Sequence, residues 1–148
     1  MLTPGFEFTD FATADVQVHA WGETINAAFE QTVHALMKTM IQNPESIGKD
    51  VTKEISITAP DKEILLVDFL SNFLALFDIE QLLISEIRVH GIQFDTAKAF
   101  YTISATVYGE IYNSEKHVTS SEVKAITFSY LKIEEKKERT DILVIFDM

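Results

Sequence analysis

The sequence predicts an α+β fold in which two helices pack on a mixed, mostly antiparallel sheet of about six to seven strands. Two observations favour this class. Apolar residues recur at spacings of three and four in two segments, which is the period of an amphipathic helix. The remaining apolar segments alternate with period two or are apolar throughout, as half-buried and central strands are.

Composition sets the first limits on function. The chain has 148 residues, of which 47% are hydrophobic, and we expect one domain over residues 1–148. It has no cysteine, which excludes a disulfide framework and a zinc finger and fits the cytoplasm. Its net charge of −11 makes direct binding of nucleic acid unexpected. Residues 1–10 lack signal-peptide features, and the apolar stretch 69–77 is too short to span a bilayer, so no membrane association is expected.

The first part of the chain predicts two strands and a helix. Residues 6–8 form a short strand, and residues 16–21 alternate between apolar and polar positions. Gly22 ends that strand, and the hydroxyl of Thr24 is a suitable cap for a helix that runs to about residue 40. The carboxylate of Asp15 is therefore expected at the rim of a strand that leads into a helix.

The middle of the chain predicts a strand over residues 51–58 and a second helix over residues 61–77. Pro60 ends the strand, and Asp61 caps the helix. The apolar positions of this helix occupy more than one stripe, which predicts that it is covered on two sides.

The remainder of the chain predicts strands. A change of parity at His90-Gly91 indicates a bulge within residues 82–94. Further strands are predicted at 99–107, 122–133 and 142–146, and the last is wholly apolar, as a central strand is. A last strand within the sheet would hold Asp147 in place.

Three oxygen-bearing groups are candidates for a metal site. Asp147 precedes Met148, so these two residues offer a side-chain carboxylate and an α-carboxylate, and Asp15 adds a third carboxylate. Such hard donors suit a divalent cation, with calcium first and magnesium or manganese as alternatives. The competing interpretation is that Asp15 is a turn or capping residue and that residues 147–148 are solvated.

Two other polar residues are candidates for contacts. His117 lies in a polar connection and is able to pair with Glu110 or Glu115. Lys124 lies in a strand segment after Glu122, either as an exposed cation paired with that residue or as a contact for a partner. No phosphate loop, dinucleotide fingerprint or nucleophile elbow is present.

Short motifs along nearly the whole chain resemble, in order and spacing, those of the archease family. They are Ala12-Thr13-Ala14-Asp15-Val16, Gly22-Glu23-Thr24, Ala28-Phe29-Glu30, Leu76-Phe77-Asp78, Gly109-Glu110, His117, Glu122-Val123-Lys124-Ala125-Ile126-Thr127 and the ending Asp147-Met148. Four departures stand beside them: Phe11 and Ala12 replace the family's Glu and His, Gln17 replaces a Gly, and Phe128-Ser129 replaces Tyr-His.

The resemblance implies a protein cofactor, not an enzyme. Archeases promote transfer of GMP onto an RtcB-type RNA ligase and so allow repeated turnover in tRNA splicing and RNA repair. The family's metal site, seen with calcium, maps onto Asp15, Asp147 and Met148. The partner would be the ligase, with Lys124 and His117 as candidate contacts.

Two alternatives remain open. The first is a chaperone-like modulator of a tRNA methyltransferase. The second is a stand-alone metal-dependent hydrolase that uses Asp15, Asp147 and His117, although the sequence shows no positioned nucleophile or base.

Overall fold

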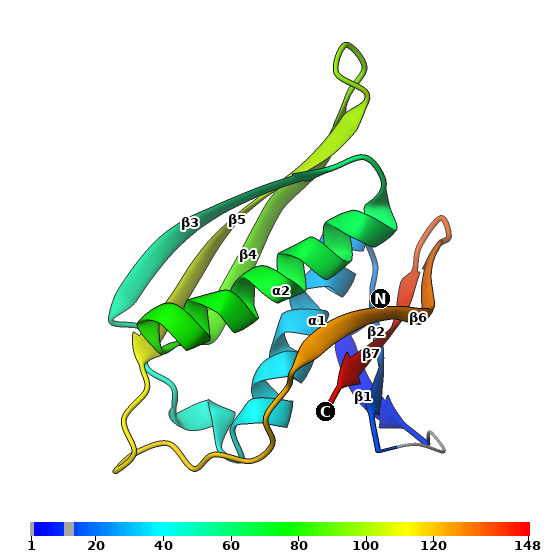
Figure 1. Cartoon of the computed structure of the whole chain (residues 1–148). Helices are drawn as coiled ribbons and strands as arrows, with labels where there is room; N and C mark the ends of the chain where they lie inside the picture. Colours follow the sequence, from blue (N-terminus) through cyan, green and yellow to red (C-terminus); the bar gives the residue numbers. More distant parts are fainter. Residues whose placement is uncertain (1, 11–13) are drawn as a thin grey trace.

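The computed structural model describes residues 2–10 and 14–148 and contains two antiparallel sheets with two helices between them (Figure 1). One sheet has four strands in the order β1-β2-β7-β6, and the other has three in the order β3-β5-β4. The predicted fold class is confirmed. The seven strands are divided between two sheets instead of forming one, and all the described strand pairs are antiparallel.

The four-stranded sheet joins the two ends of the sequence. It contains β1 (Gly5–Thr9), β2 (Val16–Gly22), β6 (Ala125–Glu135) and β7 (Thr140–Asp147). β7 lies between β2 and β6, which confirms that the wholly apolar last strand is central. Its alternate residues Ile142, Val144 and Phe146 are fully buried, and the strand packs against α1. About 25 cal/mol of stabilisation per Å² of buried apolar surface makes such a strand difficult to displace.

The three-stranded sheet is formed by the middle of the chain. It contains β3 (Val51–Ala59), β4 (Leu82–Asp95) and β5 (Phe100–Ile111). The β4–β5 hairpin extends beyond the rest of the molecule (Figure 1). A register shift between Val89 and Gly91 confirms the predicted bulge, and a second shift between Ile84 and Glu86 was not predicted.

The two helices contact both sheets. In α1 (Ile25–Met40) the Thr24 hydroxyl accepts a hydrogen bond from the Ala27 N–H, as the cap prediction requires. In α2 (Lys62–Glu80) Asp61 caps the first turn in the same way. α2 packs against β3 on one flank and β6 on the other, which confirms the prediction of a helix covered on two sides. It ends three residues later than predicted, at a left-handed Gln81.

A long connection, residues 112–124, runs from β5 to β6 across the end of α1. It has no helix or strand, but hydrogen bonds hold it in place. The N–H groups of Ser120 and Ser121 donate to the carbonyls of Met40 and Thr39, and Thr119 forms an isolated bridge with Ile41. The η1 turn (Pro44–Ser46), which follows α1, lies next to this connection, because the N–H of Val118 donates to the side chain of Asn43. This segment therefore acts as a fixed wall between α1 and β6.

None of the described helices is long and apolar enough to cross a membrane.

Candidate functional site

The structure brings Asp15 to the last residues of the chain. β2 and β7 are antiparallel, and the final pair of their ladder joins Val16 to Phe146. Continuing this register by one residue places Asp15 opposite Asp147. The backbone N–H of Met148 donates a hydrogen bond to Asp15 Oδ1 at 3.2 Å. The pairing of β2 with β7 therefore places Asp15 next to residues 147–148, as the sequence analysis expected.

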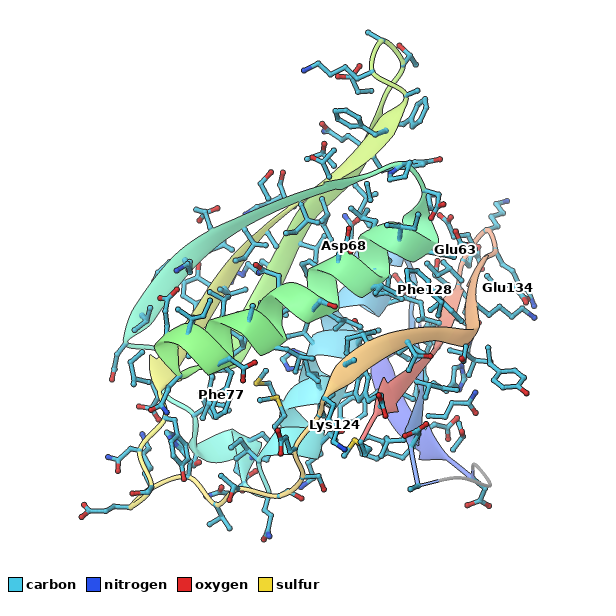
Figure 2. All side chains as sticks on the ribbon, in the orientation of Figure 1. Glu63, Asp68, Phe77, Lys124, Phe128 and Glu134 are labelled. Atoms are coloured by element: carbon cyan, nitrogen blue, oxygen red, sulfur yellow. The ribbon has the colours of Figure 1, made fainter. Side chains whose placement is uncertain are left out.

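Lys124 lies beside the same two residues. Its backbone N–H donates to the carbonyl oxygen of Asp147 at 2.8 Å, and Ala125 pairs with Asp147 across the β6–β7 ladder. The side chains of Lys124 and Asp147 are both exposed. Figure 2 shows Lys124 where β6 begins. Asp15, Lys124 and Asp147, which come from three separate parts of the sequence, are therefore gathered at one edge of the four-stranded sheet.

The donor chemistry of this edge suits a hard cation. Carboxylate and backbone oxygens are the ligands that calcium and magnesium prefer, and the two Asp carboxylates here are accompanied by no thiol, because the chain has no cysteine. Within residues 2–10 and 14–148, however, no three His, Cys, Asp or Glu side chains are grouped so as to hold a metal. Asp15 and Asp147 are therefore the acidic side chains at this edge, and the α-carboxylate of Met148 is the third donor that the sequence analysis expects there.

The edge also contains a cavity. A space of about 310 Å³ is lined by Asp15, Lys38, Ser120 and Ser121, among others. Lys38 Nζ donates to the carbonyl oxygen of Gln42 at 2.9 Å. Asp15 and Lys38 thus line one space that is large enough for a side chain or a few water molecules.

His117 is buried, whereas a contact with a partner requires an exposed side chain. Its side chain has 0% exposed area and is enclosed with Glu110. His117 Nδ1 accepts from the Asn113 N–H at 2.9 Å, so the ring proton lies on Nε2, which donates to Glu110 Oε1 at 2.6 Å. The predicted pairing with Glu110 is present, but the buried ring offers no surface to a partner.

Glu110 is the centre of this buried cluster. Hydrogen bonds from Lys116 and the Gly48 backbone N–H, assisted by His117, lower the pKa of Glu110 to about 2. The cluster ties the 112–124 connection to the strand that precedes it. Among the described residues it does not bring His117 together with Asp15 and Asp147, which is the grouping that the hydrolase alternative uses.

A second polar cluster was not predicted from the sequence. His19 lies between two carboxylates, with Nδ1 2.7 Å from Glu7 Oε2 and Nε2 2.7 Å from Asp141 Oδ1. Arg139 in turn binds Asp141 at 2.9 Å. Burial acts to lower the pKa of His19, but the two carboxylate hydrogen bonds outweigh it and raise the pKa above 6.5. The Glu7–His19 pair follows from pairing the first two strands, whereas Asp141 is 122 positions away and left no local signal.

The fold and the Asp15–Met148 contact define a small α+β protein in which Asp15 touches the last residue of the sequence where β2 and β7 pair. Residues 6–148 match the model of the Archease protein family. The chain therefore belongs to the archease family.

Curated relatives agree with this assignment over most of their length. Protein archease from Methanosarcina acetivorans is 32% identical over 136 residues, which cover 92% of this chain and 91% of the relative. Protein archease from Ictalurus punctatus is 37% identical over 97% of this chain and 85% of its own length. That from Pyrococcus furiosus is 38% identical over 82% and 83%.

Solved structures share the fold. The solution structure of Methanobacterium thermoautotrophicum protein 1598 has a TM-score of 0.77 and 28% identity, and the match covers 97% of this chain and 99% of that one. The crystal structure of a Thermotoga maritima archease, described as a possible chaperone, has a TM-score of 0.57 and 17% identity over 92% of each chain. At that identity the second similarity concerns the fold alone.

Proposed function

We propose that this chain is a protein cofactor that activates an RtcB-type RNA ligase by promoting its guanylylation, and thereby its multiple turnover. Membership of the archease family supports this proposal. The observation that carries it is the contact between Asp15, the Asp of the Thr-Ala-Asp motif, and Met148, because it gathers the residues that the family resemblance implies for function.

We further propose that Asp15, Asp147 and Met148 hold a divalent cation, with calcium first and magnesium or manganese as alternatives. A cation there would neutralise carboxylates that otherwise repel each other, and would offer open coordination positions to phosphate oxygens. The protein's own part is to fix Asp15 against the end of β7 through the β2–β7 ladder. Lys124, exposed beside Asp147, is the proposed contact to the ligase or its phosphate groups.

A second candidate function is the chaperone-like role that the resemblance to the archease family implies as an alternative. In this alternative the chain modulates a tRNA methyltransferase by keeping it soluble. The acidic composition, with 23 Asp and Glu against 12 Lys and Arg, suits a soluble companion of a basic RNA-binding enzyme.

Labelled GMP incorporation separates these candidates. The ligase from the same organism is incubated with labelled GTP, with and without this chain, and covalent label on the ligase is followed over time. Faster labelling supports the cofactor function. No acceleration, together with a methyltransferase that stays soluble only in the presence of this chain, would support the second candidate. Hydrolysis of a phosphoester by this chain alone would favour the hydrolase alternative.

A further inference from the structure

A second cavity lies on the other side of the fixed 112–124 connection from Asp15. It has a volume of about 330 Å³ and lies between the ends of α1 and α2 and the start of β6. Ser120 and Ser121 line both this cavity and the one beside Asp15, so the two spaces share a wall. Figure 2 shows Phe77, which lines the second cavity, and Lys124 on the same face of the molecule. The second cavity is therefore next to the proposed cation site but separate from it.

The second cavity has an apolar floor. Met40 and Val123 are buried at its base, while Leu74 and Phe77 of α2 are partly buried against the core and line it. A volume of about 300 Å³ is at the lower end of what protein ligand sites provide and is enough for a large side chain. An apolar recess of this kind stabilises a complex when an aliphatic or aromatic anchor fills it and displaces water.

The rim of the second cavity is acidic. Asp78 from the end of α2 and Glu122 from the connection both line it, and both are exposed. Asp78 lies near a helix C-terminus, where the macrodipole disfavours negative charge, so its carboxylate gains from a basic neighbour. A second copy of this chain, with a net charge of −11, is electrostatically mismatched to such a rim.

The Phe77 side of the second cavity is supported by residues inside the protein. The ring of Phe77 contacts Tyr112 with centroids 6.0 Å apart, and Tyr112 stacks on the buried His117 at 6.0 Å. His117 is fixed in turn by Glu110. This series of contacts holds an aromatic side of the recess in one position, and an anchor entering it does not have to order the wall first. The buried His117 thus helps to hold the surface of the recess through Tyr112 and Phe77, although it does not contact a partner itself.

We infer that the second cavity docks a basic segment of the ligase through one apolar side chain, with Lys or Arg residues next to that anchor pairing with Asp78 and Glu122. This inference rests on the proposed function, because it takes the ligase as the partner. Docking there would hold the ligase against the neighbouring Asp15–Asp147 edge. The cavity would thus determine the affinity of the complex, while the carboxylates would determine what happens once the complex has formed.

Two pairs of matched variants test the docking site. Leu74→Trp fills the recess, while Ala75→Trp places the same side chain on the next, exposed position of α2. Asp78→Lys reverses the rim charge, while Asp68→Lys makes the same change on the same helix away from the cavity (Figure 2). Lysine near the C-terminus of α2 is favourable to the helix, so Asp78→Lys is expected to fold. Thermal unfolding followed by circular dichroism checks all four variants.

Calorimetric titration of each full-length variant into the purified ligase gives the affinity, and GMP labelling at saturating variant gives the maximal rate. We expect Leu74→Trp and Asp78→Lys each to weaken binding by about tenfold or more with the maximal rate retained, and the two controls to bind like the native chain.

If the native chain accelerates labelling but all four variants bind equally, the docking inference is wrong and the cofactor function stands. If the native chain neither binds nor accelerates, both fall. Loss of a self-association step in place of ligase affinity would also contradict the inference.

Discussion

Met148 N–H donates to Asp15 Oδ1, a contact between residues 133 positions apart in the sequence. It exists because β7 is inserted between β2 and β6, so that the last residues lie beside the beginning of β2. Displacing β7 would expose a strand whose inward residues are fully buried, and this makes the relation between Asp15 and residues 147–148 as stable as the sheet itself.

Asp147→Asn is expected to weaken cation binding by this chain on the order of tenfold or more, because calcium affinity follows the number of charged ligands. Its exposed side chain leaves the fold unaffected. Calorimetric titration with calcium chloride measures the effect, and Asp50→Asn, an exposed Asp before β3, is the control. Equal calcium affinity in the native chain and Asp147→Asn would place the cation elsewhere.

Glu110→Gln is expected to reduce the sensitivity of the fold to acid. The pKa of Glu110 falls from its ordinary 4.5 to about 2 in the folded protein. A depressed pKa gives stability that is fully present above about pH 4.5 and is lost as the pH falls towards 2. Urea unfolding at several values between pH 5 and pH 2.5 should therefore show a steeper loss for the native chain than for the variant. Parallel curves would mean that Glu110 titrates normally.

His19→Gln is expected to destabilise the protein mainly at low pH. The pKa of His19 is raised in the folded state, so the ion pairs with Glu7 and Asp141 contribute fully below about pH 6.5 and fade as the pH rises through the raised value. Denaturation at pH 6 and at pH 9 measures the difference between the two proteins, and NMR titration of the His19 ring gives its pKa directly. A difference that grows with pH would contradict the assigned ion pairs.

Gly109→Ala is expected to cost about 3 kcal/mol or more of unfolding free energy. A Cβ at Gly109 would lie 1.9 Å from the carbonyl oxygen of Leu83, a backbone atom in the adjacent strand that cannot move aside alone. Gly91→Ala is the matched control, because nothing lies within 4 Å of the corresponding Cβ. Its stability should stay within about 0.5 kcal/mol of the native value. Similar urea midpoints for the two variants would show that the strand pair can separate at Gly109.

The local sequence pattern was sufficient to predict most helices and strands, but not which strands pair with each other. The caps Thr24 and Asp61 and the bulge at Gly91 left their signals within a few residues, and each was predicted correctly. The division into two sheets left no such signal, since strand partners are selected by packing around the helices. The irregular pairing of β6 was also missed: residues 128–131 oppose Val144 alone, and this segment contains the Phe128-Ser129 departure.

The candidate site residues could be predicted where the side-chain chemistry identifies them, but not where their role depends on how deeply the fold buries them. Asp15 and Asp147 were recognised as oxygen donors at strand ends, and the β2–β7 pairing brings their positions together. His117, by contrast, has a polar sequence environment, and only the folded connection shows that it is enclosed with Glu110. The Phe11-Ala12 departure from the family pattern lies outside the described residues. The side chains of Phe and Ala have no donor atom for a metal, unlike the Glu and His that they replace.

The most direct test of the central claim is GMP labelling of the ligase by the Asp15→Asn variant at saturating concentration, with calcium present and with Asp50→Asn as the control. If Asp15 acts through its carboxylate at the end of β7, Asp15→Asn should still bind the ligase but accelerate labelling at least about tenfold less than the native chain, because the amide keeps the acceptor for Met148 and loses the charge. Native acceleration by a folded Asp15→Asn variant would contradict a functional role for this carboxylate.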